Sequence, residues 1–206
     1  MRNLISFITI FMMGFNLLSA QDISLPTPQK SGGLPLMDAL NHRHSSREFS
    51  DKMLSQQQLA DLLWAANGVN RPDGKRTAPS ARNLQEIDIY VYLSTGVYFY
   101  DAIENKLVLK ASEDHREDAA MQSFATTAPV LLVFVANYDK MEGMDEDARL
   151  MYGATDCGYV SQNVYLFCAA NELNTVVLGS IYRDKIQELL QFNGKAILAQ
   201  PVGLSK

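Results

Sequence analysis

The sequence of 206 residues has few cysteines and histidines and no long run of like charges. Its 18 basic and 23 acidic side chains give a net charge of −5, which argues against a nucleic-acid partner because phosphate neutralisation needs a basic face. The histidines, His42, His44 and His115, lack the spacing of a metal site. With 47% hydrophobic and 20% charged residues, the composition excludes disorder and a polytopic membrane protein. We therefore predict a folded globular protein without a metal site.

Common nucleotide-binding and catalytic motifs are also absent. The sequence contains no G-x-G-x-x-G, no G-x-x-x-x-G-K-[ST] and no G-x-S-x-G, so a Rossmann site, a P-loop and an α/β-hydrolase are unsupported. The two cysteines, Cys157 and Cys168, lie in one predicted helix. Their spacing along that helix is roughly 16 Å, which is too long for a disulfide. We therefore predict two buried free thiols.

The first twenty residues differ in composition from the rest of the chain. Arg2 precedes an apolar stretch over residues 4–18, and Ser19-Ala20 then leads into polar residues. This pattern is typical of a secretory signal cleaved after Ala20. An uncut membrane anchor is the alternative, although the apolar run is shorter than the roughly 20 residues of a membrane span. We therefore expect an exported, periplasmic protein without stable membrane insertion after cleavage.

Helix and strand patterns alternate irregularly after the signal segment. Residues 21–34 resemble an extended arm, and we predict a single domain over residues 35–206. Periodicity predicts helices over 35–42, 55–68, 113–124, 145–171 and 183–192. It predicts strands over 87–93, 97–100, 106–110, 130–136, 176–178 and 197–202. This order indicates either an α+β or a mixed α/β domain.

Two of these helices carry more detailed expectations. Ser55 and Gln58 have the spacing of a capping box, and Gly68 is expected to end that helix in a left-handed conformation. Residues 151–170 are apolar on nearly every side, so the helix that contains them is expected to run through the core.

Three polar clusters could carry chemistry, and each has a plainer interpretation. The guanidinium groups of Arg43 and Arg47, with Ser45 between them, could hold one phosphate or carboxylate, or could lie on an exposed turn. Residues 76–85 precede a buried strand and could line a cleft, or could form a turn that satisfies its own backbone. Residues 178–180 could present backbone N–H groups to a ligand, or could be an ordinary connection.

Five motifs in this order resemble the nitroreductase superfamily. The run R-x-S-x-R-x-F over residues 43–49 resembles its FMN-binding start, and Pro79-Ser80-Ala81 resembles its second flavin segment. The pattern D-x-G-x-x-x-Q-N-x-x-L over 156–166 is similar to the start of its central helix, and residues 201–203 match its closing P-V-G turn. Residues 96–109 resemble the inserted hairpin of its SagB-type dehydrogenase branch.

The resemblance implies an α+β fold of three α-β-α layers around a central mixed, mainly antiparallel sheet, in an interlocked homodimer with FMN at the interface. It implies an FMN-dependent oxidoreductase that transfers hydride to or from a small organic substrate by a ping-pong mechanism, with NAD(P)H as a possible electron donor. Flavin performs the hydride chemistry, so no catalytic acid or base is assigned. The alternative is a flavin-binding or interaction protein without turnover.

The resemblance also implies which residues bind the cofactor. One group surrounds the FMN phosphate and ring edge, a second approaches the flavin from the other subunit, and a third faces the ring near N5. In chain order these residues are Arg43, His44, Ser45, Arg47, Ser80, Arg82, Asn83, Gln85, Gly179, Ser180 and Lys206.

Overall fold

The computed structural model describes residues 21–206, so the predicted signal segment of residues 1–20 lies outside it. These residues form one seven-stranded sheet in the order β1-β4-β3-β2-β5-β7-β6, and its six strand pairs are antiparallel. The strands are β1 (Ile23–Ser24), β2 (Ile87–Leu93), β3 (Gly96–Asp101), β4 (Lys106–Ser112), β5 (Val130–Asn137), β6 (Leu173–Thr175) and β7 (Gly194–Leu204).

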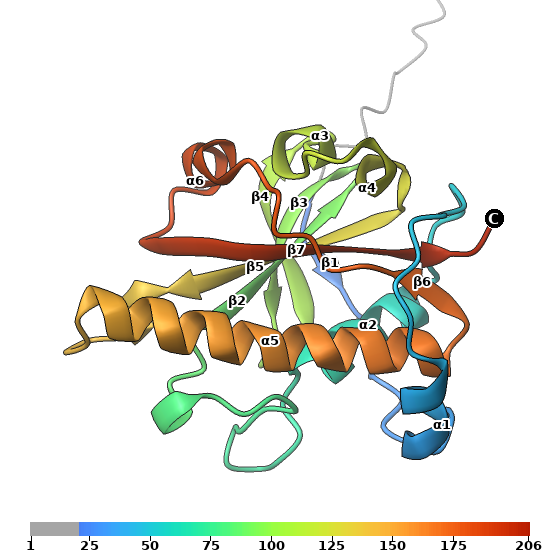
Figure 1. Cartoon of the computed structure of the whole chain (residues 1–206), viewed down its shortest axis with the longest axis horizontal. Coiled ribbons are helices and arrows are strands. Elements are labelled where there is room, and N and C mark those ends of the chain that lie inside the picture. The colour runs from blue at the N-terminus through green and yellow to red at the C-terminus, as the bar shows by residue number, and fades with distance from the viewer. Residues whose placement is uncertain (1–20) are drawn as a thin grey trace, which may run out of the picture.

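Helices cover both faces of this sheet (Figure 1). The α-helices are α1 (Leu36–His42), α2 (Gln56–Asn67), α3 (Arg116–Ala119), α4 (Ser123–Thr127), α5 (Glu146–Ala170) and α6 (Arg183–Leu190). Two 3₁₀ turns, η1 (Ala81–Asn83) and η2 (Tyr138–Lys140), follow α2 and β5 along the chain. Figure 1 shows α2 and α5 on one side of the sheet and α3, α4 and α6 on the other. The expected α+β fold of three layers with a mainly antiparallel sheet is therefore confirmed.

The centre of the sheet is buried on both faces, as the apolar run of residues 130–136 predicts. Every residue of β2 is buried, and all of β5 except its last residue is buried. Leu132 and Phe134 belong to the core under α2 and α5, whereas Leu131 and Val133 belong to the core on the opposite face. Successive side chains of β5 thus point alternately into the two cores on opposite faces of the sheet.

The start of α2 confirms the capping box, but its end corrects the prediction for Gly68. The backbone N–H of Gln58 donates to Ser55 Oγ over 3.1 Å, and the Gln58 side chain accepts from the Ser55 N–H over 3.0 Å. Gly68 is extended, with φ −78° and ψ 164°, and is not left-handed. A Cβ at this position would lie 2.4 Å from Trp64 Cδ1 and 2.6 Å from Trp64 Cα. Close approach, rather than handedness, therefore requires glycine here.

The single helix predicted over residues 113–124 is wrong. The structure has two short helices, α3 and α4, with an extended break between them. Within the break, Ala120 pairs with Ile181 in an isolated β-bridge, and the Met121 N–H donates to Ser180 O over 3.3 Å. Pairing with a distant segment therefore replaces the helical hydrogen bonds that the local pattern favours.

The strand predicted over residues 176–178 lies three residues too late. The strand β6 pairs with β7 as far as Thr175 and Val202. The next pair in the same register is the isolated bridge between Leu178 and Ala199. Between these pairs the Val177 N–H donates to the Tyr165 hydroxyl over 2.9 Å. The Val177 N–H points away from β7, because the Leu178–Ala199 pair exchanges both backbone hydrogen bonds and only alternate pairs of an antiparallel ladder do so. The ladder is interrupted instead at Val176, which lies opposite Pro201, a residue with no N–H to donate.

The long helix α5 begins after the cap Asp145, whose carboxylate accepts from the Ala148 N–H over 2.8 Å. The predicted path through the core is wrong, because α5 lies on one face of the sheet and exposes Met151 and Tyr159 on its other side. No helix within residues 21–206 is long and apolar enough to cross a membrane.

The two cysteines of α5 are free and buried, as predicted. Burial raises the pKa of both the Cys157 and the Cys168 thiol. Both groups therefore remain protonated thiols at neutral pH.

Candidate functional site

The segment from Arg43 to Ser50 runs along the edge of the sheet, beside β6 and the end of β7. The Ser46 N–H donates to Thr175 O, and the Ser50 N–H donates to Leu204 O, each over 2.9 Å. The Asn174 side chain adds a bond to Glu48 O over 2.7 Å. These hydrogen bonds fix the backbone of the first predicted cluster. They do not involve the side chains of its two arginines.

The two arginines of this segment lie over aromatic rings. The Arg43 guanidinium lies 5.3 Å from the centre of the Tyr165 ring, and that of Arg47 lies 5.8 Å from the centre of the Phe124 ring. Within residues 21–206 neither arginine forms an ion pair. A guanidinium over an aromatic face is held by a cation–π interaction, which does not use its N–H groups as hydrogen-bond donors. Both side chains can therefore bind an anion.

Tyr165 is a residue of this site that the sequence analysis missed. Its hydroxyl lies 2.9 Å from Ser45 Oγ and accepts the hydrogen bond from the Val177 N–H. It therefore joins the R-x-S-x-R segment to the chain that leads into Gly179. The signal in the sequence is a phenol on a helix whose other buried residues are all smaller, and a buried phenol hydroxyl usually has a hydrogen-bond partner.

Gly179 and Ser180 lie on the surface next to the same structural elements. The Met121 N–H donates to Ser180 O, and Phe124, three residues later, carries the stacked Arg47. A Cβ at position 179 would have no atom within 4 Å, so its backbone is open to close approach. The first and third predicted clusters therefore border one region of the surface.

His44 and Lys206 lie at the margins of this region. The exposed His44 places Nδ1 2.8 Å from His42 O. Lys206 is exposed two residues beyond β7, whose final residue Leu204 is bonded to Ser50. The end of the described chain therefore continues from the strand that holds the arginine segment.

The second predicted cluster lies elsewhere in the same protomer. The Ala81 N–H donates to Asp156 Oδ2 over 2.7 Å, which attaches this loop to α5. Asp156 precedes Tyr165 by nine residues, or roughly 13 Å along the helix axis. In Figure 1 the loop is seen below α5, whereas the chain after α1 rises beside β6. One protomer therefore does not bring the clusters around Arg43 and Ser80 together.

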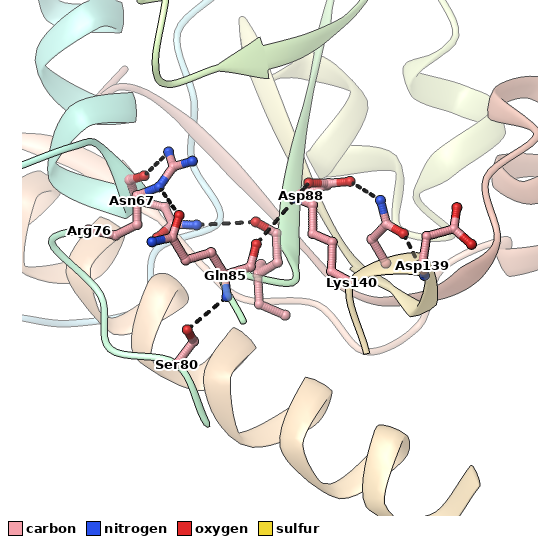
Figure 2. Close-up of polar contacts among 9 residues, drawn as sticks. Asn67, Arg76, Ser80, Gln85, Asp88, Asp139 and Lys140 are labelled. Carbon is pink, nitrogen blue, oxygen red and sulfur yellow. Dashed lines mark hydrogen bonds and ion pairs between the residues drawn. The ribbon is translucent and has the colours of Figure 1, made fainter. Parts of the chain in front are cut away.

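Residues of the second cluster divide into two kinds (Figure 2). Ser80 Oγ accepts from the Gln85 N–H over 2.9 Å, and Gln85 Oε1 accepts from Arg76 Nε over 2.9 Å. These two polar residues thus shape their own loop, as the plainer interpretation expects. Arg82 and Asn83 are exposed instead, with left-handed φ angles of 54° and 58°. Asn83 Oδ1 accepts from Gln85 Nε2 over 3.4 Å, and both exposed side chains can reach another molecule.

The polar network in Figure 2 includes an ion pair. Lys140 Nζ lies 2.6 Å from Asp88 Oδ1 and donates to Gln85 O over 3.2 Å. Arg76 also donates to Asn67 O, and burial lowers the pKa of its guanidinium. The network encloses a cavity of about 240 Å³ and holds the end of the loop against β2.

Comparison with known proteins identifies the family. The Nitroreductase family model matches residues 40–204, which is most of the chain. The chain belongs to the nitroreductase family. A relative from Methanocaldococcus jannaschii, named as a putative nitroreductase, is 32% identical over 192 residues, covering 88% of this chain and 96% of the relative. This family membership identifies the protein as an oxidoreductase.

Solved structures agree with the family assignment. A protein from Ralstonia eutropha, also named as a putative nitroreductase, has 40% identity and a TM-score of 0.87, with 92% of this chain and 91% of that chain covered. One chain of the E. coli microcin synthetase complex has 17% identity and a TM-score of 0.68, covering 100% of this chain and 85% of that chain. The latter likeness is one of fold alone. The hairpin β3–β4 is present, while the SagB-type branch stays a prediction.

Proposed function

We propose that this nitroreductase-family protein is a homodimeric FMN-dependent oxidoreductase acting on a small organic substrate, with NAD(P)H as electron donor. The observation that carries the proposal is the pair of guanidinium groups, Arg43 and Arg47, that lie over aromatic rings without an ion-pair partner within residues 21–206. They lie on a surface that Gly179 and Ser180 also border. An anion joined to a flat ring fits this arrangement.

The residues fit the two halves of FMN. A phosphate monoester carries nearly two negative charges at neutral pH, which Arg43 and Arg47 can bind with bidentate geometry. Lys206 would add a third positive charge, with Ser45 and His44 beside it. The exposed backbone at Gly179 and Ser180 allows a planar ring to approach closely. When bound, FMN supplies hydride transfer in two half-reactions, which is ping-pong chemistry.

The second cluster would complete the site from the partner subunit. Arg82 and Asn83 project from the loop, while Ser80 and Gln85 hold its shape. Because this loop and the arginine segment lie apart in one protomer, a second copy is needed to bring them to one flavin.

Exposed apolar side chains on α1 and α5 support association of two copies. Met37 and Leu36 are 73% and 63% exposed, and Met151 and Tyr159 on α5 are 55% and 47% exposed. Since α1 packs on α5, these side chains belong to neighbouring elements. Large exposed apolar patches are typical of protein interfaces. The proposal also includes export to the periplasm after cleavage at Ala20, which depends on the sequence pattern alone.

The visible spectrum of purified residues 21–206, with chromatography of any released flavin, tests this proposal. We expect stoichiometric FMN, reduction by NAD(P)H and reoxidation by a quinone or nitroaromatic acceptor. A colourless protein that also ignores added FMN would overturn the proposal. Bound FMN without turnover by any donor or acceptor would support the non-catalytic flavin-binding alternative.

A matched pair of variants tests the phosphate assignment. Arg43→Ala/Arg47→Ala should lose the flavin, while Lys110→Ala/Lys195→Ala removes two exposed charges elsewhere and should retain it. Flavin retained at the wild-type level in the arginine variant would contradict the assignment.

A further inference from the structure

Glu86 is a fully buried acid at the junction of the loop and β2, with an exposed fraction of 0%. Its backbone is fixed, because its carbonyl accepts from the Asn137 N–H over 3.0 Å. Neither oxygen of its carboxyl group has a donor partner within the described chain. An ionised carboxylate in such a position has a high desolvation cost.

The side chain of Glu86 contacts a second buried acid, Asp156 on α5, which is 3% exposed. Two ionised carboxylates are both acceptors, so this contact becomes a hydrogen bond only when one of them carries a proton. Burial, and then the contact with Asp156, raise the pKa of Glu86 to about 7. Lys140 opposes this effect, but its ammonium group is already bound to Asp88 and Gln85 O.

Asp156 connects this pair of acids to the loop that carries Arg82 and Asn83. Its Oδ2 accepts from the Ala81 N–H over 2.7 Å. Arg82, Asn83 and Gln85 have left-handed φ angles of 54°, 58° and 52°. Such conformations are unfavourable for side-chain-bearing residues and persist only where surrounding contacts hold them. The shape of the loop therefore depends on anchors such as Asp156.

We propose that one proton shared between Glu86 and Asp156 positions the loop of residues 80–85 against the flavin of the other subunit. Glu86 is thus a positioning residue, and this role rests on the proposed function above. With the proton present, Glu86 donates to Asp156, which keeps its bond to the Ala81 N–H. When the proton leaves to solvent, two buried negative charges repel each other, and the anchor of the loop weakens. Flavin affinity should therefore fall as pH rises through neutrality.

The first test measures the titration of Glu86 in the protein without flavin. In Glu86→Gln the amide donates to Asp156 at every pH, so this variant keeps the bond and removes the titration. Because the pKa of this acid is higher in the folded protein than in the unfolded one, the free energy of unfolding is greatest below the pKa of the unfolded state. It decreases as the pH rises from there through the pKa of the folded state. From about pH 5 to about pH 8.5 the melting temperature of the wild-type apoprotein should therefore fall relative to that of Glu86→Gln. Glu104→Gln, at an exposed position, should follow the wild type.

The second test measures the dissociation constant of FMN for the same three proteins. Over this pH range we expect the wild type and Glu104→Gln to lose about tenfold in affinity, and Glu86→Gln to change by much less. The infrared spectrum at acidic pH should contain a protonated-carboxyl band that Glu86→Gln lacks. Both results together would support the inference.

The outcomes separate the two proposals. Parallel stability profiles of the wild type and Glu86→Gln would overturn the shared proton. Divergent stability with parallel FMN profiles would overturn the positioning role alone. A wild-type protein that binds no FMN at any pH would overturn the proposed function and the positioning role, while the stability comparison would still decide whether the proton is shared.

Discussion

The hydroxyl of Tyr165 lies 2.9 Å from Ser45 Oγ, on a helix turn far from Ser45 in the sequence. The same oxygen accepts from the Val177 N–H, so one atom of α5 joins two segments of the proposed flavin site. This bond holds the chain between Thr175 and Leu178, where the ladder with β7 is interrupted. The chain that leads to Gly179 is therefore held by a side chain of α5 as well as by strand pairing.

Tyr165→Phe tests this relationship. The variant leaves the partly buried Val177 N–H without this acceptor. Such a loss costs about 1–3 kcal/mol at a fully buried site, so we expect the lower end of that range here. We expect a lower melting temperature and weaker FMN binding, measured by calorimetry and flavin fluorescence. Tyr152→Phe, between three and four turns earlier on the same helix, should change neither quantity. Equal behaviour of the two variants would show that the Tyr165 hydroxyl does not connect the site.

Single substitutions of the two arginines should separate binding from stability. Hydrogen bonds to charged groups contribute about 1.5–3 kcal/mol, so Arg43→Ala or Arg47→Ala should weaken FMN binding by about 10- to 100-fold. Arg47 is exposed, and the melting temperature of Arg47→Ala without flavin should stay close to that of the wild type. Titration calorimetry with FMN measures the first effect. A variant that binds FMN as tightly as the wild type would remove that arginine from the site.

Gly68→Ala should destabilise the protein through a steric clash. The added Cβ would lie 2.6 Å from the backbone of Trp64, which cannot move without bending α2. Overpacking of this kind costs about 1–3 kcal/mol. Gly143→Ala is the matched comparison, because Gly143 has a φ of 76° and no atom within 4 Å of the added Cβ. Its cost of about 1 kcal/mol would come from the backbone alone. Chemical denaturation should rank Gly68→Ala as the less stable of the two variants.

Tyr159→Glu should separate the proposed dimer. Tyr159 is 47% exposed on α5, and a charge placed in an apolar interface would have no partner there. We expect sedimentation velocity to show a monomer that has lost most of its FMN, because the loop with Arg82 and Asn83 would no longer reach the second flavin. Ile103→Glu changes an apolar residue that is 76% exposed at the tip of the β3–β4 hairpin and should leave a flavin-bound dimer. A dimeric Tyr159→Glu protein with full FMN would place the interface elsewhere.

Local patterns were sufficient for much of this fold. The continuous apolar run in β5, the capping box at Ser55 and the hairpin β3–β4 appear where the sequence predicts them. Each depends on interactions within one element or between neighbouring strands, so periodicity and turn residues carry the information. The ordered motifs also placed Arg43 and Arg47 in one short segment. The motifs and the family match over residues 40–204 both depend on residue identities along the sequence.

Only the tertiary structure decided the features whose partners lie far apart in the sequence. The break between α3 and α4 exists because Ala120 pairs with Ile181, and β6 ends early because Val176 lies opposite Pro201, which has no N–H to donate. No pattern within residues 113–124 or 176–178 contains those partners. The contact between Glu86 and Asp156 likewise appears only when β2 packs against α5. The sequence thus determined most of the elements and the ionic groups of the proposed site, whereas packing decided where two of the predicted elements break and which buried groups meet.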